Sequence, residues 1–267
     1  MSRFYIGVDD KARNIKGGYI GINGVARKIK KIYLGDENGV AKEVYSSGKK
    51  LSEYTVGSTV YLNENGTPVE YLIVHIGLPS SLYDSSCNGV WLLRKDAREN
   101  NGCTWHTPNI NNYGESAIHE YLNNYFLNLF DNKLKTIIKS VKIPYVNGTG
   151  KGGLINSGSN GLSTKIFLLG AYECGVTTSY SNYIPVDGAC LSYFNGSTDS
   201  KRIAYLNGVA TQWWCRSPDT ESTTHAWYST VSGSLGRVGT SYLANIRPAL
   251  ILPLDTLFDE KTNKFNG

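Results

Sequence analysis

The segment Trp213-Trp214-Cys215-Arg216-Ser217-Pro218 is followed, about 30 residues later, by Ile246-Arg247-Pro248-Ala249-Leu250-Ile251-Leu252. Between them the sequence predicts two short strands at residues 226–231 and 237–242, with a Ser-Gly-Ser turn at residues 232–234. We therefore expect the C-terminal part of the chain to consist of short strands joined by polar loops.

Two helices are predicted upstream of this segment. Ser116 can cap the first and Asp131 the second, and Pro144 closes the second soon after its end. Apolar residues recur at helical spacing in both and are assigned to the core. They are Ile118, Tyr121, Leu122, Tyr125 and Leu129 in the first helix, and Leu134, Ile137, Ile138 and Val141 in the second. Two early helices among short strands indicate an α+β fold.

Three further strand signals precede or follow these helices. Residues 59–62 and 69–76 flank Asn63-Glu-Asn-Gly-Thr-Pro, which predicts a hairpin. Gly89–Arg94 is typical of a buried strand, and residues 166–169 form another strand candidate. The Gly- and Ser-rich stretch at residues 147–163 is expected to be a loop.

A repeat opens the chain. Tyr-Ile-Gly-Val at residues 5–8 returns as Tyr-Ile-Gly-Ile at residues 19–22 and as Tyr-Leu-Gly at residues 33–35, a spacing of 14 both times. Each copy contains Asp-Asp or Asn-Gly and then a second strand-like run. Because Asn-Gly between alternating runs is a strong hairpin signal, we expect small β-hairpins over about 45 residues. Residues 46–51 are expected to be a linker.

The excess positive charge lies on this N-terminal arm. Residues 1–50 hold 11 Lys and Arg against 5 Asp and Glu, whereas the remaining 217 residues hold 16 against 17. A basic arm can bind nucleic acid or an acidic surface, but a solvated strand face has the same composition. We favour the solvated face and expect no nucleic-acid partner.

The arm resembles a repeat found at the start of bacteriophage tail and other structural proteins. The match covers residues 4–45 and rests on the three phased copies. The resemblance implies attachment to other virion subunits, or to sister copies in a homo-oligomer such as a trimer. We therefore divide the chain into an attachment region at residues 1–50 and a ligand-binding domain at residues 51–267.

Composition and motifs argue against several classes of protein. The chain of 267 residues is 40% hydrophobic, enough to form a core, and no run approaches the roughly 20 apolar residues that span a membrane. Arg3, Asp9, Asp10 and Lys11 leave no room for the apolar region of a signal peptide. The Gly-rich stretch at residues 148–153 lacks the helix that a nucleotide-binding loop precedes.

No metal or cofactor is expected from the motifs. His75, His106, His119 and His225 lack zinc-ligand spacing, and no Cys-x-x-Cys occurs. The five cysteines are predicted to be reduced, small and buried. Disulfides between Cys87 and Cys103, or between Cys174 and Cys190, are left open, since the members of each pair are 16 residues apart.

The loops are rich in aromatic and small polar residues. Tyr and Trp offer large contact areas at low entropic cost, and Ser, Gly and Asn adapt their hydrogen bonds, as in antibody paratopes. Residues 219–245 combine both kinds and lie between two anchoring segments. The candidate ligand-binding residues there are His225, Trp227, Tyr228, Arg237, Tyr242 and Asn245. Strand alternation should bury about half of them and leave the others in one patch.

Residues 85–253 resemble a large family of bacterial and phage domains. These domains are similar to the C-type-lectin fold of retroelement-diversified tropism proteins and formylglycine-generating enzymes. Trp213–Pro218 and the Arg-Pro-Ala of residues 247–249 are the specific part of the match. Supporting stretches are residues 88–94, 121–123, 141–145 and 171–173. Cys215 stands where the family often has Leu, which affects packing.

The resemblance implies neighbouring chain ends and a ligand face formed by late loops. It makes Trp213, Trp214, Arg216, Arg247 and Pro248 scaffold residues. Calcium is not implied, because the Glu-Pro-Asn or Gln-Pro-Asp and Trp-Asn-Asp motifs of calcium-dependent lectins are absent. No motif supports Cys190 and Cys215 as the reactive pair of a formylglycine-generating enzyme.

Together these features predict a non-enzymatic binding protein, such as a phage tail-tip or receptor-binding component. Its partner would be a bacterial cell-surface protein or glycan, recognised without membrane insertion. We expect synthesis in the bacterial cytoplasm, and location in the virion or secretion without a signal peptide. The alternatives are a glycan-acting enzyme on the same fold and a bacterial adhesin or structural module.

Overall fold

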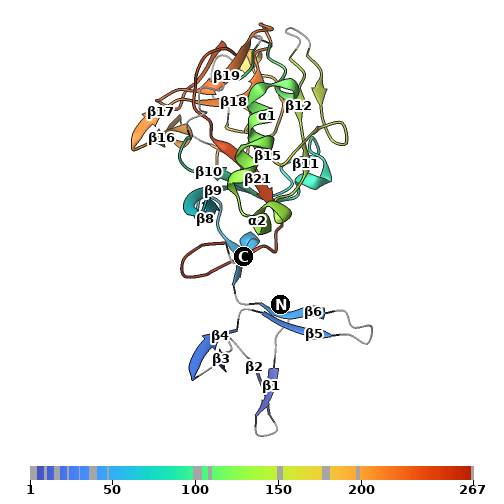
Figure 1. Ribbon diagram of the computed structural model, residues 1–267. Helices are drawn as coiled ribbons and strands as arrows, with labels where there is room; N and C mark the ends of the chain where they lie inside the picture. Colours follow the sequence, from blue (N-terminus) through green and yellow to red (C-terminus); the bar gives the residue numbers. More distant parts are fainter. Residues whose placement is uncertain are drawn as a thin grey trace.

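The structure is a computed structural model in which strands predominate. It describes residues 5–8, 11–14, 19–22, 24–29, 31–35, 41–46, 48–98, 104–107, 110–148, 153–175, 181–196 and 199–265. These residues include two α-helices and many short strands, so the fold is mixed α+β, as predicted. Figure 1 shows a compact body, with three small hairpins at the N-terminal end of the chain.

A five-stranded antiparallel sheet lies at the centre of the body. Its strands, in spatial order, are β15 (Ile166–Leu168), β21 (Pro248–Leu252), β10 (Gly89–Arg94), β9 (Thr67–Gly77) and β8 (Thr59–Glu64). Every residue of β21 and all but the last residue of β10 are buried. Their near-continuous apolar sequences follow from coverage of both faces of the sheet.

The predicted hairpin between β8 and β9 is confirmed. The strands pair in register from Thr59 opposite Leu72 to Glu64 opposite Thr67. Asn65 and Gly66 form the two-residue turn with φ values of 49° and 78°. Both central residues of such a turn need positive φ, which Gly and Asn tolerate best.

A three-stranded antiparallel sheet carries the segment that opened the sequence analysis. It consists of β18 (Trp213–Pro218), β19 (His225–Ser229) and β20 (Leu235–Gly239), with β19 in the middle. All six residues of β18 are buried, and its pairing with β19 shifts register between Trp214 and Pro218. This sheet contacts the central sheet, since the backbone N–H of Arg216 donates to Leu169 O at 3.0 Å.

The first predicted helix is shorter than its apolar stripe. Ser116 caps α1 (Ala117–Asn124) by accepting from the His119 N–H at 3.2 Å. A 3-10 segment, Phe126–Leu129, then continues the chain, so the 3.6-residue spacing is lost. Tyr125 is consequently 50% exposed rather than buried, although Leu129 reaches the core.

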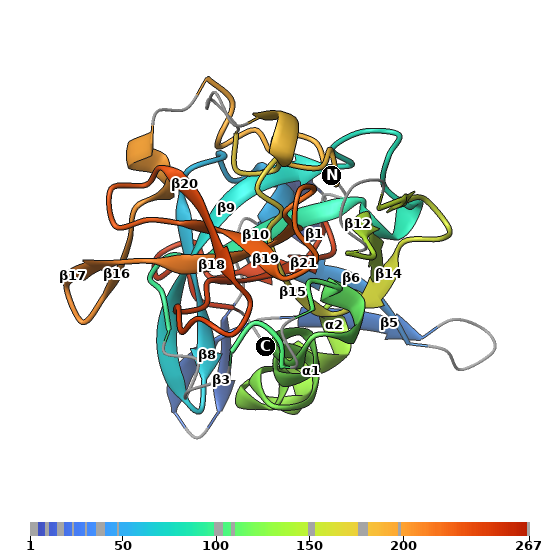
Figure 2. The same ribbon diagram turned by 90° about the horizontal axis from the view of Figure 1, so that it is seen from above.

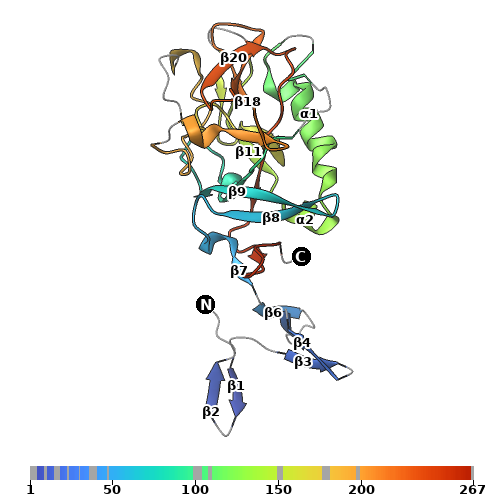
Figure 3. The ribbon, with the colours of Figure 1, turned by 90° about the vertical axis from the view of Figure 1, so that its left-hand side faces the viewer.

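The second predicted helix is also shorter than expected. Asp131 caps α2 (Asn132–Ile137), accepting from the Leu134 N–H at 2.7 Å. The assignment of Val141 to this helix is wrong, because Val141 begins strand β11 (Val141–Ile143) and pairs with Thr164. Pro144 therefore follows a strand. The two helices lie together along one side of the body (Figures 2 and 3).

Four small two-stranded sheets complete the body. They are β11 with β14 (Leu162–Thr164), β12 (Tyr145–Val146) with β13 (Ile155–Asn156), β16 (Ala204–Leu206) with β17 (Val209–Thr211), and β7 (Lys49–Lys50) with β22 (Leu257–Phe258). Further 3-10 segments are Leu51–Glu53, Ser85–Cys87, Tyr113–Glu115, Ser181–Tyr183 and Asp199–Arg202. The β16–β17 hairpin projects from the side of the body (Figures 1 and 2).

Residues 49–51 belong to the body and not to a linker. β7 pairs with β22, which brings the two ends of the body side by side, as the family resemblance implied. Leu51 is fully buried, and its N–H donates to Thr256 O at 2.8 Å. The expected linker is therefore wrong for these three residues.

The repeated units near the N-terminus form three hairpins, as their spacing predicts. They pair β1 (Tyr5–Val8) with β2 (Lys11–Asn14), β3 (Tyr19–Ile22) with β4 (Val25–Lys28), and β5 (Lys31–Gly35) with β6 (Ala41–Ser46). Each is a separate two-stranded sheet, located beyond the β7–β22 end of the body (Figure 3). Their independence from the body remains a prediction.

That independence can be tested by truncation. A chain starting at Gly48 keeps β7 and should fold with an unchanged urea midpoint. A chain starting at Thr55 lacks Leu51 and Tyr54, both buried. Since loss of one buried Leu side chain costs about 2–5 kcal/mol, this second truncation should be clearly destabilised. An unfolded 48–267 fragment would show that residues 1–47 contribute to the core.

The scaffold role of Trp214 predicts a large stability effect. Trp214 is fully buried, and its ring meets those of Tyr228 and Tyr242 at centroid distances of 6.0 and 6.5 Å. Trp214→Ala should lower the free energy of unfolding by about 3–5 kcal/mol, with Trp214→Phe as a milder control. An unchanged unfolding curve for the alanine variant would contradict burial of this side chain.

Candidate functional site

The candidate ligand face is built on a buried arginine. Arg216 lies in β18, and its guanidinium donates to both carboxylate oxygens of Glu173, at 2.7 and 2.6 Å. Both side chains are fully buried. A bidentate pair of this kind fixes orientation as well as charge, which makes it a strong positioning contact.

Arg216 also joins segments that are distant in sequence. It donates to the carbonyl oxygens of Leu168 at 3.0 Å, Pro144 at 3.1 Å and Asp187 at 2.7 Å. These carbonyls belong to β15, to the chain after β11, and to the loop before residue 190. One side chain of the β18–β19–β20 sheet therefore bonds to three separate segments of the body.

A second carboxylate, Asp187, lies beside this pair. Ser217 Oγ is 2.9 Å from both oxygens of Asp187, and Tyr83 donates to Glu173 at 2.6 Å. Burial raises the pKa of Asp187 to about 6, although the nearby Arg216 opposes the shift. Burial, together with Glu173, also raises the pKa of Tyr83. One cation thus faces two buried carboxyl groups.

The residues assigned to the scaffold are all buried. Trp213 and Trp214 are fully buried, and Arg247 and Pro248 lie under the surface at the start of β21. Arg247 Nε donates to Arg94 O at 2.9 Å, and its guanidinium lies 5.2 Å from the centroid of the Trp213 ring. Burial lowers the pKa of Arg247 to about 10.

The six predicted ligand residues differ in exposure. Two of them are exposed: Tyr242 as a whole is 44% exposed, and the side chain of Arg237 is 37% exposed. His225, Tyr228 and Asn245 are half-buried. Trp227 is buried and donates its indole N–H to Tyr183 O at 3.2 Å. Trp227 is thus a core residue, and its side chain is not part of the surface.

One group of these residues forms an aromatic cluster. The rings of Tyr228 and Tyr242 are 6.5 Å apart, and both contact the buried ring of Trp214. Gln212 donates to the Tyr242 hydroxyl at 2.8 Å, and Asn245 donates to Thr211 Oγ1 at 2.7 Å. We call Trp214, Tyr228, Tyr242, Gln212 and Asn245 the tyrosine site. It places amide groups beside partly exposed tyrosine rings.

The second group lies around a buried acid. Arg237 donates to Asp219 at 2.8 Å and stacks over the Tyr183 ring at 4.8 Å. His225 Nδ1 lies 2.8 Å from Ser222 Oγ. The main-chain carbonyl of His225 accepts from the buried side chain of Asn111. These contacts hold both candidate side chains to neighbouring loops.

Strand geometry explains why the six residues do not form one patch. Side chains alternate across a strand, so His225 and Trp227 in β19 share one face and Tyr228 lies on the other. Arg237 is paired with Trp227 and shares its face, whereas Tyr228 is paired with Gly236. A Cβ on Gly236 would meet the Tyr228 ring at 3.0 Å. The expectation of a single patch is therefore wrong.

Gln212 is the tyrosine-site residue that the sequence did not single out. It immediately precedes the Trp213–Pro218 segment, and no motif in the sequence marks it. Its backbone oxygen also accepts from the Asn245 N–H at 3.2 Å. The bond to Tyr242, 30 residues away, is visible only in the fold.

The cysteines that the structure describes carry free thiols. Cys87, Cys174 and Cys215 are buried, as expected, whereas Cys190 is exposed. The Cys174–Cys190 disulfide that was left open is therefore not formed. Burial raises the pKa of Cys87 to about 12, which makes its thiol unreactive. Cys103 lies outside the described residues.

The described residues contain neither a cluster of metal ligands nor a membrane-spanning helix. Among the described side chains, no group of three or more His, Cys, Asp or Glu residues is placed to hold a metal ion. No helix in the described ranges has both the length and the apolar character needed to cross a membrane. The Gly-rich stretch at residues 148–153 falls mostly outside the described residues.

A family model described as "Domain of unknown function (DUF6273)" matches residues 88–254. The chain belongs to this family. The match includes the central strands β10 and β21, both helices, and the sheet that carries the tyrosine site. No curated protein and no solved structure matches the chain.

The buried Asp187 predicts a characteristic dependence of stability on pH. Its pKa is raised from 3.8 to about 6 in the folded protein, so the folded state binds this proton more tightly. The stabilisation is complete below pH 3.8 and is lost as the pH rises through 6. Asp187→Asn removes this loss. Its free energy of unfolding relative to wild type should rise by about 2 kcal/mol between pH 4 and pH 7, measured by urea titration.

Asp84→Asn provides a control of opposite sign. Hydrogen bonds from Ser86 lower the pKa of Asp84, so its contribution to stability is lost as the pH falls. Parallel pH profiles for wild type and Asp187→Asn would contradict the raised pKa.

Proposed function

We propose that this chain is a non-enzymatic ligand-binding protein that recognises a bacterial cell-surface protein or glycan. The observation that carries the proposal is the tyrosine site. Tyr228 on strand β19 and Tyr242 in the turn after β20 bring two rings together, and Gln212 donates to the Tyr242 hydroxyl, so stacking and hydrogen bonding are offered at one place. Tyr and Trp dominate binding energetics in many interfaces because they bury much area with few rotatable bonds.

The support beneath this site favours binding over a purely structural role. Trp214 forms a buried floor under Tyr228 and Tyr242, and Arg216, two residues further along β18, is fixed by the bidentate pair with Glu173. Side chains held by such a floor lose little freedom when a ligand binds. Tyr242 nevertheless stays accessible to a partner.

We further propose the architecture and location that the resemblance implies. The body would have a C-type-lectin-like fold of the kind used by phage tropism proteins, which retroelements diversify. Its neighbouring ends at β7 and β22 are consistent with that fold. Residues 1–45 would attach the body to virion or tail subunits, or to sister chains in a homo-oligomer such as a trimer. Isolated two-stranded hairpins are only marginally stable, which favours such a partner.

The proposal is tested by comparing the two groups of candidate residues. The double variant Tyr242→Ala, Asn245→Ala should abolish attachment to bacterial cells, measured by a pull-down of the labelled protein. The matched double variant His225→Ala, Arg237→Ala alters the other face of the β18–β19–β20 sheet and should bind like wild type. Tyr242→Ala alone should change stability by less than about 0.5 kcal/mol, which thermal unfolding can verify.

The reciprocal result would overturn the assignment. If the first double variant binds cells at wild-type strength while the second does not, the ligand face is the Arg237 side. If both bind normally, the ligand is recognised elsewhere on the chain. Pull-down with purified cell-wall glycan and with outer-surface protein then distinguishes the two classes of partner.

A further inference from the structure

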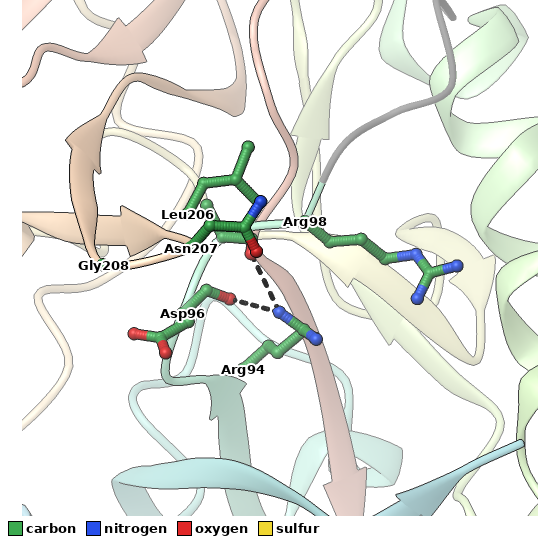
Figure 4. Close-up of a pocket in the computed structure, with 7 residues that line it drawn as sticks. Arg94, Asp96, Arg98, Leu206, Asn207 and Gly208 are labelled. Carbon is green, nitrogen blue, oxygen red and sulfur yellow. Dashed lines mark hydrogen bonds between the residues drawn. The ribbon is translucent and has the colours of Figure 1, made fainter. Parts of the chain in front are cut away.

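A pocket of ≈ 450 Å³ lies beside the turn of the β16–β17 hairpin and shares no lining residue with the tyrosine site. One wall consists of the end of β10 and the residues after it: Arg94, Asp96, Ala97 and Arg98. The opposite wall is the turn at Leu206, Asn207 and Gly208. Figure 4 shows this turn across from Asp96 and Arg94, with the Arg98 side chain directed away from both.

Two arginines at this pocket share one carboxylate. Arg94 Nε donates to Glu64 Oε1 at 2.9 Å, and Arg98 Nη1 donates to Glu64 Oε2 at 3.4 Å. Glu64 is buried and also accepts from the Tyr71 hydroxyl at 2.7 Å. Glu64 thus accepts three hydrogen bonds. The one from Arg98 is longer than the usual range of 2.7–3.2 Å.

Two guanidinium N–H groups near the pocket are buried without a partner. They are Nε of Arg98 and Nη1 of Arg247, neither of which has a hydrogen-bond partner among the described residues. Arg247 lies directly behind the strand end, since its Nε donates to Arg94 O at 2.9 Å. An unsatisfied buried donor on a charged group is costly, and such groups often mark a place for an ion or ligand.

The residues that line the pocket include two arginines, Arg94 and Arg98, and one carboxylate, that of Asp96. The buried Glu64 accepts from both arginines, and Arg247 lies behind the strand end, over the Trp213 ring. Figure 4 shows the Asp96 carboxylate pointing away from the Arg94 guanidinium, which instead donates to the carbonyls of Asp96 and Ala97 at 2.8 and 2.9 Å. The Asp96 carboxylate therefore does not pair with Arg94, whose anionic partner among the described residues is Glu64.

We propose that this pocket binds an oxyanion, the carboxylate or phosphate group of a small ligand or of an acidic glycan. Arg98 is the main ligand-binding residue. Its side chain is 28% exposed, and its guanidinium is held by one long bond to Glu64 and lies 5.7 Å from the centroid of the Phe126 ring. A turn toward an anion in the pocket would give Arg98 a charge-assisted hydrogen bond. The site is separate from the tyrosine site and does not depend on the function proposed for it.

The test uses the full chain and three probes at constant ionic strength. Inorganic phosphate and glucuronate supply the two oxyanions, and glucose is the neutral match of glucuronate. Isothermal titration calorimetry should detect binding of phosphate or glucuronate to the protein, and no binding of glucose. The oxyanion that binds more tightly identifies whether phosphate or carboxylate is the natural group. Equal binding of glucose and glucuronate would overturn the proposal.

Variants with opposite expected effects separate an anion site from a structural role. Arg98→Gln should weaken anion binding about tenfold, the value of one charge-assisted bond. Asp96→Asn removes the repelling carboxylate and should tighten binding several-fold. Because Asp96 is exposed, this variant remains informative even if Arg98→Gln does not fold. Arg237→Gln, an arginine outside the pocket, is the matched control and should bind like wild type.

The proposal fails if neither oxyanion binds the wild-type protein. It also fails if Arg98→Gln binds as wild type does, or if Asp96→Asn weakens binding. A loss of cell attachment in the tyrosine-site variants leaves these anion titrations unchanged, so the two proposals can fail separately.

Discussion

The buried pair of Arg216 and Glu173 is the constraint on which the arrangement of the body depends. A guanidinium without access to water must have its donors satisfied, because desolvation of an unpaired charge costs several kcal/mol. Glu173 supplies two acceptors, and main-chain carbonyls of Leu168, Pro144 and Asp187 supply three more. These atoms can converge only if several separate segments take up fixed positions around β18.

This constraint extends to the surfaces. Because β18 is fixed from beneath, its neighbours β19 and β20 present their alternating side chains in a defined way. Tyr228 lies over Trp214 on one face, whereas Arg237 bonds to Asp219 on the other. The arginine pocket is positioned similarly, through the bond from Arg247, just before β21, to the end of β10. Both candidate sites therefore lie on rigid strands next to turns.

Features fixed by local interactions were predictable from the sequence. The Asn65-Gly66 turn follows from the positive φ that both residues tolerate, and the caps at Ser116 and Asp131 follow from their side-chain oxygens. The buried strand β10 was predicted from its apolar run, and the N-terminal hairpins from the 14-residue repeat. Each signal involves residues within one turn, one helix end or one strand.

Long-range contacts decided the remainder. α1 ends at Asn124 because the chain tightens into a 3-10 segment, and Val141 leaves the helical pattern because pairing with Thr164 places it in a strand. Sequence alone predicted the α+β class, and the family resemblance implied the scaffold residues that the structure buries. Only the tertiary structure decided that Glu173 is the partner of Arg216, that Trp227 belongs to the core, and that Gln212 meets Tyr242. The physical reason is that these partners are separated by tens of residues and meet only when whole strands and loops pack together.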